Sequence, residues 1–274
     1  MTLELLWERA GLPELELPHD LHERYDGGLG FDEPCVFANF VETLDGIVAI
    51  PELEQSNALV ADQSDDDKFV MGLLRACADV VLVGSGTTLA SPKGTWRPER
   101  VYPMAAEGFA ELRRLRGKPE RPVVAVVTTG ASLDTAHPIL ADGAVVLTTR
   151  RGAELLRGAV PDVVAVNDGD RVDLRAAIGV LRECGHSLIL SEAGPTLFGS
   201  LLAAGLVDEL FLTVSPVVAG RLGPGRLALV EGVELLPELR VAPRLVSLRR
   251  SGDHLFARYS FRRESTANRG GHPS

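Results

Sequence analysis

A single carboxylate, Glu192, stands where a buried strand gives way to a helix. In "HSLILSEAGPTLFGSLLAAGL" the apolar run of residues 186–191 leads into Glu192, and a helical pattern starts after Gly194-Pro195. A helix that begins there presents free backbone N–H donors in its first turn, and anions bind to such donors readily. A phosphate is therefore expected on Gly194, Pro195, Thr196 and Leu197. Glu192 either accepts hydrogen bonds from a substrate or caps nearby backbone amides.

A glycine-rich turn follows another apolar run in "VLVGSGTTLA". Its residues are Gly84, Ser85, Gly86 and Thr87. Because glycine has no Cβ, a phosphate or a flat ring can approach the backbone closely at such a turn. The spacing is neither the GxGxxG fingerprint nor a Walker loop. The turn therefore predicts either a dinucleotide contact or a tight connection without a ligand.

Two further turns carry charged side chains at strand ends. Asp45-Gly46 follows the run 35–41, and "TTRRG" places Arg150 and Arg151 at the end of the run 144–149. Asp-Gly is first of all a turn signal. Paired arginines either grip a phosphate through parallel hydrogen bonds or remain solvated turn residues. Because the carboxyl ends of parallel strands share one edge of a sheet, we expect these turns to converge there.

The elements that must position these turns alternate between strands and helices. Short runs that are apolar on both faces suit the central strands of a parallel sheet, and they occupy 35–41, 79–84, 122–130, 144–149, 163–166 and 186–191. Helical patterns lie between them, among them "SDDDKFVMGLLRACA", with Ser64 as N-cap, and "DLRAAIGVLREC". The last runs, "DELFLTVSPVV", "RVAPRLVSLRRS" and "HLFARYSFRRE", have no long helices between them and predict an antiparallel edge. The expected fold is α/β, a mostly parallel sheet with helices on both faces.

One domain is expected over residues 34–262. Residues 1–33 are mixed in character and are interpreted as an N-terminal extension, and residues 263–274 have the composition of a disordered tail. The proline- and arginine-rich stretch 91–103 predicts a long surface loop near the site.

The composition excludes several classes of function. A net charge of −10 argues against nonspecific nucleic-acid binding, which needs a basic face. We find no signal peptide, no apolar run of ~18 residues that would predict a membrane span, and no metal-ligand motif. Cys35, Cys77 and Cys184 are widely spaced and lie in apolar runs, which favours buried thiols in a reducing, cytoplasmic compartment.

In their order along the chain, these motifs resemble the reductase domain of bacterial riboflavin biosynthesis. The resemblance covers about residues 34–262 and is carried by "TLDG", "LRACADVVLVGSGTTLA" and "SEAGPTLFGSLLAAGLVDELFLTVSPVVAG". It implies the three-layer dihydrofolate reductase fold and a homodimer. It also implies NADPH-dependent reduction, with hydride transfer from the nicotinamide to C1 of the ribosyl group of 5-amino-6-(5-phosphoribosylamino)uracil.

The resemblance also implies roles for individual residues. Asp45 and Glu192 would be catalytic. NADPH would contact Val41, Gly84, Ser85, Gly86, Thr87, Thr128, Gly194, Pro195, Thr196 and Leu197, and Arg150 is assigned to the 2′-phosphate by its charge. The substrate would contact Asn39, Ser56, Arg75 and Glu192, with Arg75 near a phosphate.

The sequence departs from the family's pattern on the substrate side. Asn39 stands where the family has Lys, Ser56 lacks its aromatic neighbour, and "SPKGTWRPER" replaces a segment that helps to hold the phosphoribosyl group. Nothing in these 274 residues matches the zinc-ligand motifs of the family's cytidine-deaminase-like partner domain. Losing phosphate contacts can change which substrate is turned over. Two alternatives therefore remain: a reductase of another substrate, such as dihydrofolate or another pterin, and a non-catalytic NADP-binding protein.

Overall fold

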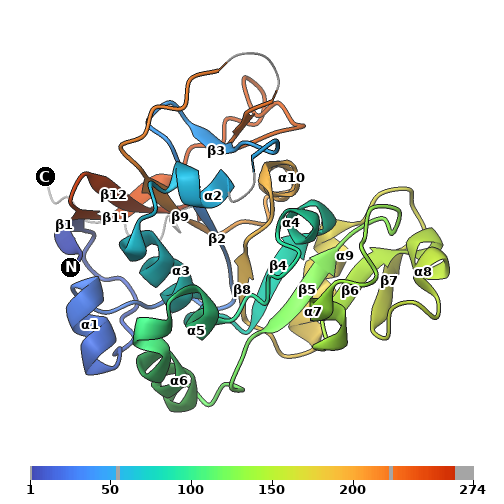
Figure 1. The fold of residues 1–274 in the computed structure, drawn as a ribbon, viewed down its shortest axis with the longest axis horizontal. Coiled ribbons are helices and arrows are strands. Elements are labelled where there is room, and N and C mark those ends of the chain that lie inside the picture. The colour runs from blue at the N-terminus through green and yellow to red at the C-terminus, as the bar shows by residue number, and fades with distance from the viewer. Residues whose placement is uncertain (1, 54–55, 222–224, 263–274) are drawn as a thin grey trace, which may run out of the picture.

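The valine-rich runs of the sequence form the centre of one ten-stranded sheet (Figure 1). The computed structural model describes residues 2–53, 56–221 and 225–262. The strand order is β1-β11-β12-β9-β2-β8-β4-β5-β6-β7. In that order the strands are Glu4–Glu8, Arg244–Ser251, His254–Ser260, Glu209–Val214, Cys35–Glu42, Leu188–Ser191, Val80–Gly84, Val123–Val127, Val145–Thr149 and Val163–Asn167. The strands from β9 to β7 run parallel, and β12, β11 and β1 extend the sheet antiparallel.

Helices cover both faces of this sheet, as strands buried on both sides require. On one face, Phe69, Leu73 and Phe109 belong to a core beneath α1 (His19–Tyr25), α3 (Asp65–Cys77), α6 (Ala106–Leu115) and α7 (Pro138–Ala141). On the other face, Ile178 and Phe198 belong to a second core beneath α9 (Leu174–Glu183) and α10 (Pro195–Ala203). The expected α/β architecture, with its mostly parallel sheet and antiparallel edge, is confirmed.

Short elements connect the main strands and helices. They are α2 (Ser56–Val60), α4 (Ser85–Ala90), α5 (Pro98–Val101), the 3-10 turn Pro103–Ala105, α8 (Arg150–Leu156), and the separate pair β3 (Ile47–Ala49) and β10 (Leu227–Ala228). Figure 1 shows α2 and β3 above the end of β2, and α4 beside β4.

The main helices begin where the sequence predicts. The side chain of Ser64 accepts a hydrogen bond from Asp67 N–H at the start of α3, and that of Asp173 accepts two at the start of α9. Pro195 occupies the first turn of α10. These starts depend on local chemistry, in which a short polar side chain satisfies a free N–H or proline supplies a fixed φ.

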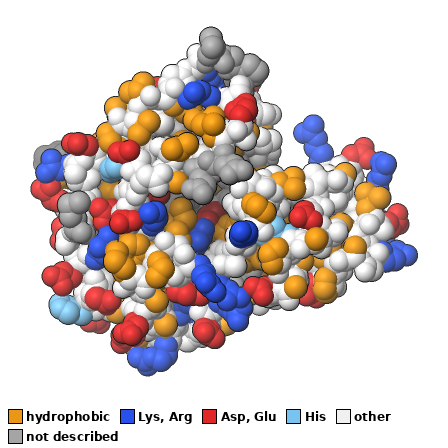
Figure 2. Space-filling view, viewed as in Figure 1, with side chains coloured by type: hydrophobic (Ala, Val, Ile, Leu, Met, Phe, Trp, Pro, Cys, Tyr) orange, Lys and Arg blue, Asp and Glu red, His pale blue; other side chains and the backbone are white. Residues whose placement is uncertain are grey.

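The surface carries mixed charge. Figure 2 shows acidic and basic side chains interspersed over the viewed face. No helix of the described residues has the length and apolar character needed to cross a membrane.

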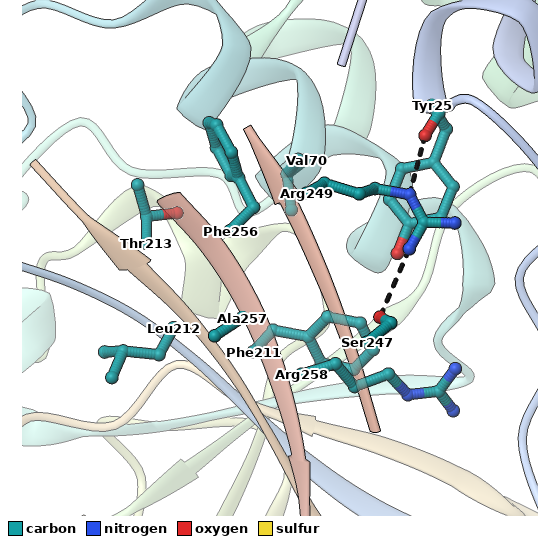
Figure 3. Close-up of a pocket in the computed structure, with 10 residues that line it drawn as sticks. All are labelled: Tyr25, Val70, Phe211, Leu212, Thr213, Ser247, Arg249, Phe256, Ala257 and Arg258. Carbon is teal, nitrogen blue, oxygen red and sulfur yellow. Dashed lines mark hydrogen bonds between the residues drawn. The ribbon is translucent and has the colours of Figure 1, made fainter. Parts of the chain in front are cut away.

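Residues 2–33 pack onto the same sheet as the rest of the chain. β1 pairs with β11, and the buried side chains Leu3, Leu21 and Tyr25 join the core beneath α3. The Arg249 guanidinium lies 4.0 Å from the centroid of the Tyr25 ring and donates from Nε to the Tyr25 carbonyl at 2.8 Å (Figure 3). The cavity drawn there measures about 10 Å³, enough for one water. It is lined by Tyr25, Val70 and residues of β9, β11 and β12.

Two expectations were wrong in detail. The stretch 91–103 is not simply a surface loop, because it contains α5 and buries Trp96 and Tyr102 against the core beneath α3. Cys35 and Cys77 are buried, but Cys184 is exposed, since it follows the last residue of α9. Burial raises the pKa of the Cys77 thiol to about 11, so it stays protonated at neutral pH. Residues 263–274, expected to be a disordered tail, lie outside the described residues.

Candidate functional site

The turns singled out in the sequence follow neighbouring strands. The carboxyl ends of β2, β8, β4, β5 and β6 lead to Asp45, Glu192, Gly84, Thr128 and Arg150, in that order across the sheet. All five strands are parallel, so their carboxyl ends lie at one edge. In open α/β sheets this edge is where ligands bind.

A gap opens at this edge because β8 is shorter than its neighbours. β8 ends at Ser191, which pairs with Ala38 on one side and Leu82 on the other. β2 continues to Glu42 and β4 continues to Gly84. The two longer strands therefore flank a position that no strand of the described residues fills.

The backbone of β2 points into this gap. The Cys35 N–H bonds to Ser187 on the β8 side, whereas the Glu42 carbonyl accepts from Ser215 on the β9 side. Because peptide groups alternate in direction along a strand, the odd-numbered residues of β2 face β8. The N–H and C=O of Val41, three residues beyond Ala38, are thus directed toward the gap.

Glu192 lies at the inner end of the gap and is paired with Arg75 of α3. Nε and Nη2 of Arg75 donate to Oε1 and Oε2 of Glu192 at 2.7 and 2.6 Å. The two side chains are only 11% and 10% exposed. The Glu192 N–H donates to the Leu82 carbonyl at 3.0 Å, which fixes its backbone to β4. Asn39 follows Ala38 on β2 as Glu192 follows Ser191 on β8, so the register places the two residues level with each other. Arg75, expected at a substrate phosphate, thus has two of its donors committed to Glu192.

The glycine-rich turn after β4 contacts the start of α10. The Gly194 N–H donates to Thr87 Oγ1 at 3.1 Å. A Cβ on Gly84 would lie 3.4 Å from Leu197, so these backbones approach closely. No side chain of the described residues caps α10, and Thr196 in its first turn is exposed. The two predicted phosphate-binding turns therefore form one continuous surface.

This surface continues toward β5 and β6. Ser85 Oγ lies 2.8 Å from Ser132 Oγ in the turn after β5. A Cβ on Gly130, which has φ +97°, would be 3.2 Å from the Cα of Gly152 in α8. Thr128 is buried, and its hydroxyl accepts from the Gly130 N–H at 3.0 Å. Arg150, at the start of α8, pairs with Asp168, and their side chains are 69% and 74% exposed.

Asp45 anchors a different segment. Its Oδ1 accepts from Thr43 Oγ1 at 2.6 Å and from the Ala219 N–H at 3.0 Å, and its Oδ2 accepts from the Gly220 N–H at 2.7 Å. The hydrogen bond from Thr43, with those from the two backbone amides, lowers the pKa of Asp45 to about 2. Asp45 is therefore an ionised anchor between the β2–β3 turn and residues 219–220. No hydrogen bond or ion pair of the described residues joins it to Glu192.

Ser56 also holds a turn. As the first residue of α2, it accepts a hydrogen bond on Oγ from the Ile50 N–H at 2.6 Å. This contact closes the loop after β3, beside the end of β2.

Sequence reasoning missed a buried carboxyl near the pair. Asp67 lies two helical turns before Arg75 on α3 and is 4% exposed. Burial raises its pKa to about 6, and the charge of Glu192 adds to that rise, whereas a hydrogen bond with Thr213 and the charge of His254 oppose it. In "SDDDK" the residue reads only as a first-turn carboxylate that suits the helix dipole. Its eight-residue spacing from Arg75 is the signal that could have found it.

Comparison with known families shows which family the chain belongs to. Residues 34–255 match the family described as RibD C-terminal domain. The chain belongs to this family. Two relatives, from Archaeoglobus fulgidus and Methanothermobacter thermautotrophicus, are each 30% identical to it and carry the name 2,5-diamino-6-ribosylamino-4(3H)-pyrimidinone 5′-phosphate reductase. The first alignment covers 76% of this chain and 91% of the relative, and the second covers 83% and 98%.

A solved structure shares the fold. The pyrimidine reductase-like protein of Corynebacterium diphtheriae superposes with a TM-score of 0.67 at 21% identity, over 84% of this chain and 93% of that chain. The resemblance seen in the sequence, to a riboflavin-pathway pyrimidine reductase, is therefore confirmed at the level of family and fold.

Proposed function

We propose that the chain is an NADPH-dependent reductase of a phosphoribosylaminopyrimidine. The observation that carries the proposal is the Arg75–Glu192 pair at the inner end of the gap where β8 stops. A fixed carboxylate there adjoins both the open backbone of β2 and the turn after β4. Family membership supports the reductase class.

The residues present fit a dinucleotide. Val41 directs its peptide groups into the gap, where the amide of a nicotinamide could pair with them. Next to the gap, the Thr87–Gly194 contact and the exposed first turn of α10 suit a pyrophosphate, because an uncapped helix start favours anions. Thr128, Ser132 and Arg150 extend this surface toward the adenosine end.

The chemistry needs alignment more than it needs a reactive side chain. The bound cofactor supplies a hydride. At the substrate, C1 of the ribosyl group would gain that hydride as the C1–O ring bond breaks, and the ring oxygen would take a proton from water. Glu192 and Asn39 would position the substrate, and the two hydrogen bonds from Arg75 hold the Glu192 carboxylate in one orientation. Asp45, with its pKa of about 2, would act as an anion and not as an acid.

Two pyrimidines differ in one ring substituent. The resemblance implies 5-amino-6-(5-phosphoribosylamino)uracil, whereas the two archaeal relatives are named for the 2,5-diamino pyrimidinone. We propose the diamino compound as the preferred substrate. A carboxylate such as Glu192 accepts a hydrogen bond from an exocyclic amine, while the uracil presents a carbonyl oxygen at that position.

The test has two stages. Purified protein is titrated with NADPH and NADH, and each pyrimidine is then supplied while the loss of reduced cofactor is followed. NADPH binding with turnover of either pyrimidine supports the proposal, and a higher kcat/KM for the diamino compound supports the substrate assignment. Binding without turnover of pyrimidines or dihydropterins would indicate a non-catalytic NADP-binding protein, and turnover of a dihydropterin alone would indicate a different substrate. A protein that binds neither cofactor would overturn the reductase proposal.

We further propose that the enzyme works as a homodimer in the cytoplasm. The homodimer is supported by the sheet face near β1 and β12. The apolar side chains of Trp7 and Leu255 are 46% and 37% exposed on that face, where a second copy could cover them. The two buried free thiols, Cys35 and Cys77, support a reducing compartment.

A further inference from the structure

The far end of the carboxyl edge carries an exposed pair of opposite charges. Arg150 begins α8 directly after β6, and its Nε donates to Oδ1 of Asp168, which directly follows β7. Glu154, one helical turn further along α8, also acts on the charge of Arg150. Figure 2 shows basic and acidic side chains side by side at the end of the molecule that carries α8 and β7.

The turn that presents Asp168 is well defined. The Asn167 side chain donates to the Arg171 carbonyl at 2.8 Å and accepts from the Asp173 N–H at 3.2 Å. Thr149 and Asn167 are partners in the β6–β7 ladder, so the residues that follow them emerge side by side. Asp168 is therefore held next to Arg150 by backbone geometry and by charge.

This position suits the adenosine ribose of the proposed cofactor. β6 lies three strands from β8, about 14 Å from the gap at the usual spacing of strands. The Ser85–Ser132 contact and the close approach of Gly130 to Gly152 link the pyrophosphate surface to the start of α8. A dinucleotide with its nicotinamide in the gap would thus bring its adenosine ribose to the Arg150–Asp168 pair.

The two charges favour different cofactors. A guanidinium attracts the 2′-phosphate of NADPH, whereas a carboxylate repels that phosphate and accepts a hydrogen bond from the free 2′-hydroxyl of NADH. An arginine already paired with a carboxylate offers less attraction to a phosphate, because the pair must open or carry an extra negative charge.

We propose that Asp168 is a specificity-determining residue that narrows the preference of this reductase for NADPH over NADH. This inference rests on the proposed function. The wild-type protein binds NADPH more tightly than NADH by less than about tenfold. Arg150 supplies the attraction to the 2′-phosphate, and Asp168 opposes it.

The test measures dissociation constants of both cofactors by calorimetry at low and high salt. Asp168→Asn is expected to tighten NADPH binding about three- to tenfold and to leave NADH unchanged or slightly weaker. Arg150→Gln is expected to weaken NADPH binding without affecting NADH. The effect of Asp168→Asn should shrink at high salt, because both side chains are exposed. Asp170→Asn is the matched control, since it removes an exposed carboxylate from the same turn.

The outcomes separate this inference from the function on which it rests. If NADPH binds and Asp168→Asn changes its affinity no more than Asp170→Asn does, the assignment of Asp168 is wrong while the reductase proposal stands. The assignment of Asp168 would also be wrong if the wild-type protein bound NADPH far more than tenfold more tightly than NADH. If neither cofactor binds, both proposals fail.

Discussion

The guanidinium of Arg75 and the carboxylate of Glu192 form two parallel hydrogen bonds, at 2.7 and 2.6 Å, where β8 ends. This bidentate geometry is among the stronger polar contacts in proteins. Both side chains are nearly buried, so removing either one leaves an unpaired charge out of reach of water. The pair therefore fixes the direction of the Glu192 carboxylate at the gap.

Replacing Glu192 with Gln tests whether that carboxylate serves the reaction. We expect kcat to fall by roughly 100-fold or more, while the dissociation constant of NADPH changes less than about threefold, because the proposed cofactor contacts lie on β2, α4 and α10. Steady-state kinetics and cofactor titration measure the two effects separately. Glu33→Gln is the control, since Glu33 pairs with Arg116 at 2.7 Å just before β2, at the opposite edge. An unchanged kcat in the Glu192 variant would reduce the pair to a structural contact.

The features of the fold that depend on local chemistry could be predicted from the sequence. The valine-rich strands and the starts of α3 and α10 follow from periodicity, from Ser64 and from Pro195. The Arg75–Glu192 pair joins residues 117 positions apart, and the gap depends on where β8 stops relative to β2. Such long-range register has no local signal, so the sequence placed both residues at the site without showing that they bind each other.

Replacing Asp45 with Asn tests the anchor between the β2–β3 turn and residues 219–220. The amide keeps one acceptor oxygen and loses the charge, so the contacts with the two backbone N–H groups weaken. We expect faster hydrogen exchange at Ala219 and Gly220, together with lower turnover. Because the pKa of Asp45 is lowered to about 2, the anchor is complete above its ordinary value of 3.8 and is lost only as pH falls toward 2.

The lowered pKa of Asp45 also predicts a feature of the pH–rate profile. No limb of the profile above pH ~4 should belong to Asp45. A neutral-pH limb that disappears in Asp45→Asn would contradict its role as an ionised anchor. Asp62→Asn is the control, because that carboxylate is exposed and lies after α2.

Replacing Thr87 with Val tests the join between the turn after β4 and α10. The variant loses the hydroxyl that accepts from the Gly194 N–H at 3.1 Å. A lost hydrogen bond of this kind costs about 0.5–1.5 kcal/mol, so cofactor affinity should fall roughly two- to tenfold if Gly194 helps to hold the pyrophosphate. Thr87→Ser keeps the hydroxyl and should bind cofactor as the wild type does. Weakening in Thr87→Ser alone, with Thr87→Val binding as the wild type does, would mean that the methyl group, and not the hydrogen bond, matters.

Replacing Leu255 with Asp tests the proposed homodimer. Ladder pairing puts Trp7, Leu248, Ala257 and Leu212 on one face of the antiparallel strands. Leu255 is on the same face, two residues from Ala257 along β12. A charge there should convert a dimer to a monomer in light scattering. Leu115→Asp is the control and should stay dimeric, because Leu115 is 59% exposed and lies at the end of α6, away from these strands. A wild-type protein that is already monomeric would refute the assembly.

Replacing Asp67 with Asn tests the buried carboxyl on α3. Because burial raises its pKa from 3.8 to about 6, the folded protein holds this proton more tightly than the unfolded chain does. The resulting stabilisation is complete below pH 3.8 and is lost as pH rises through about 6. The total loss is about 3 kcal/mol, of which about 1 kcal/mol falls between roughly pH 5 and pH 7.5.

Denaturant unfolding at those two pH values measures this loss. The wild type should be less stable at the higher pH by about 1 kcal/mol relative to Asp67→Asn, because the amide has no proton to lose. Asp65→Asn changes the same charge in the same helical turn, but Asp65 is exposed and pairs with Lys68, which lowers its pKa. That control should keep the pH dependence of the wild type. If Asp67→Asn also keeps it, Asp67 is ionised throughout this range, and its charge adds directly to that of Glu192 beside the gap.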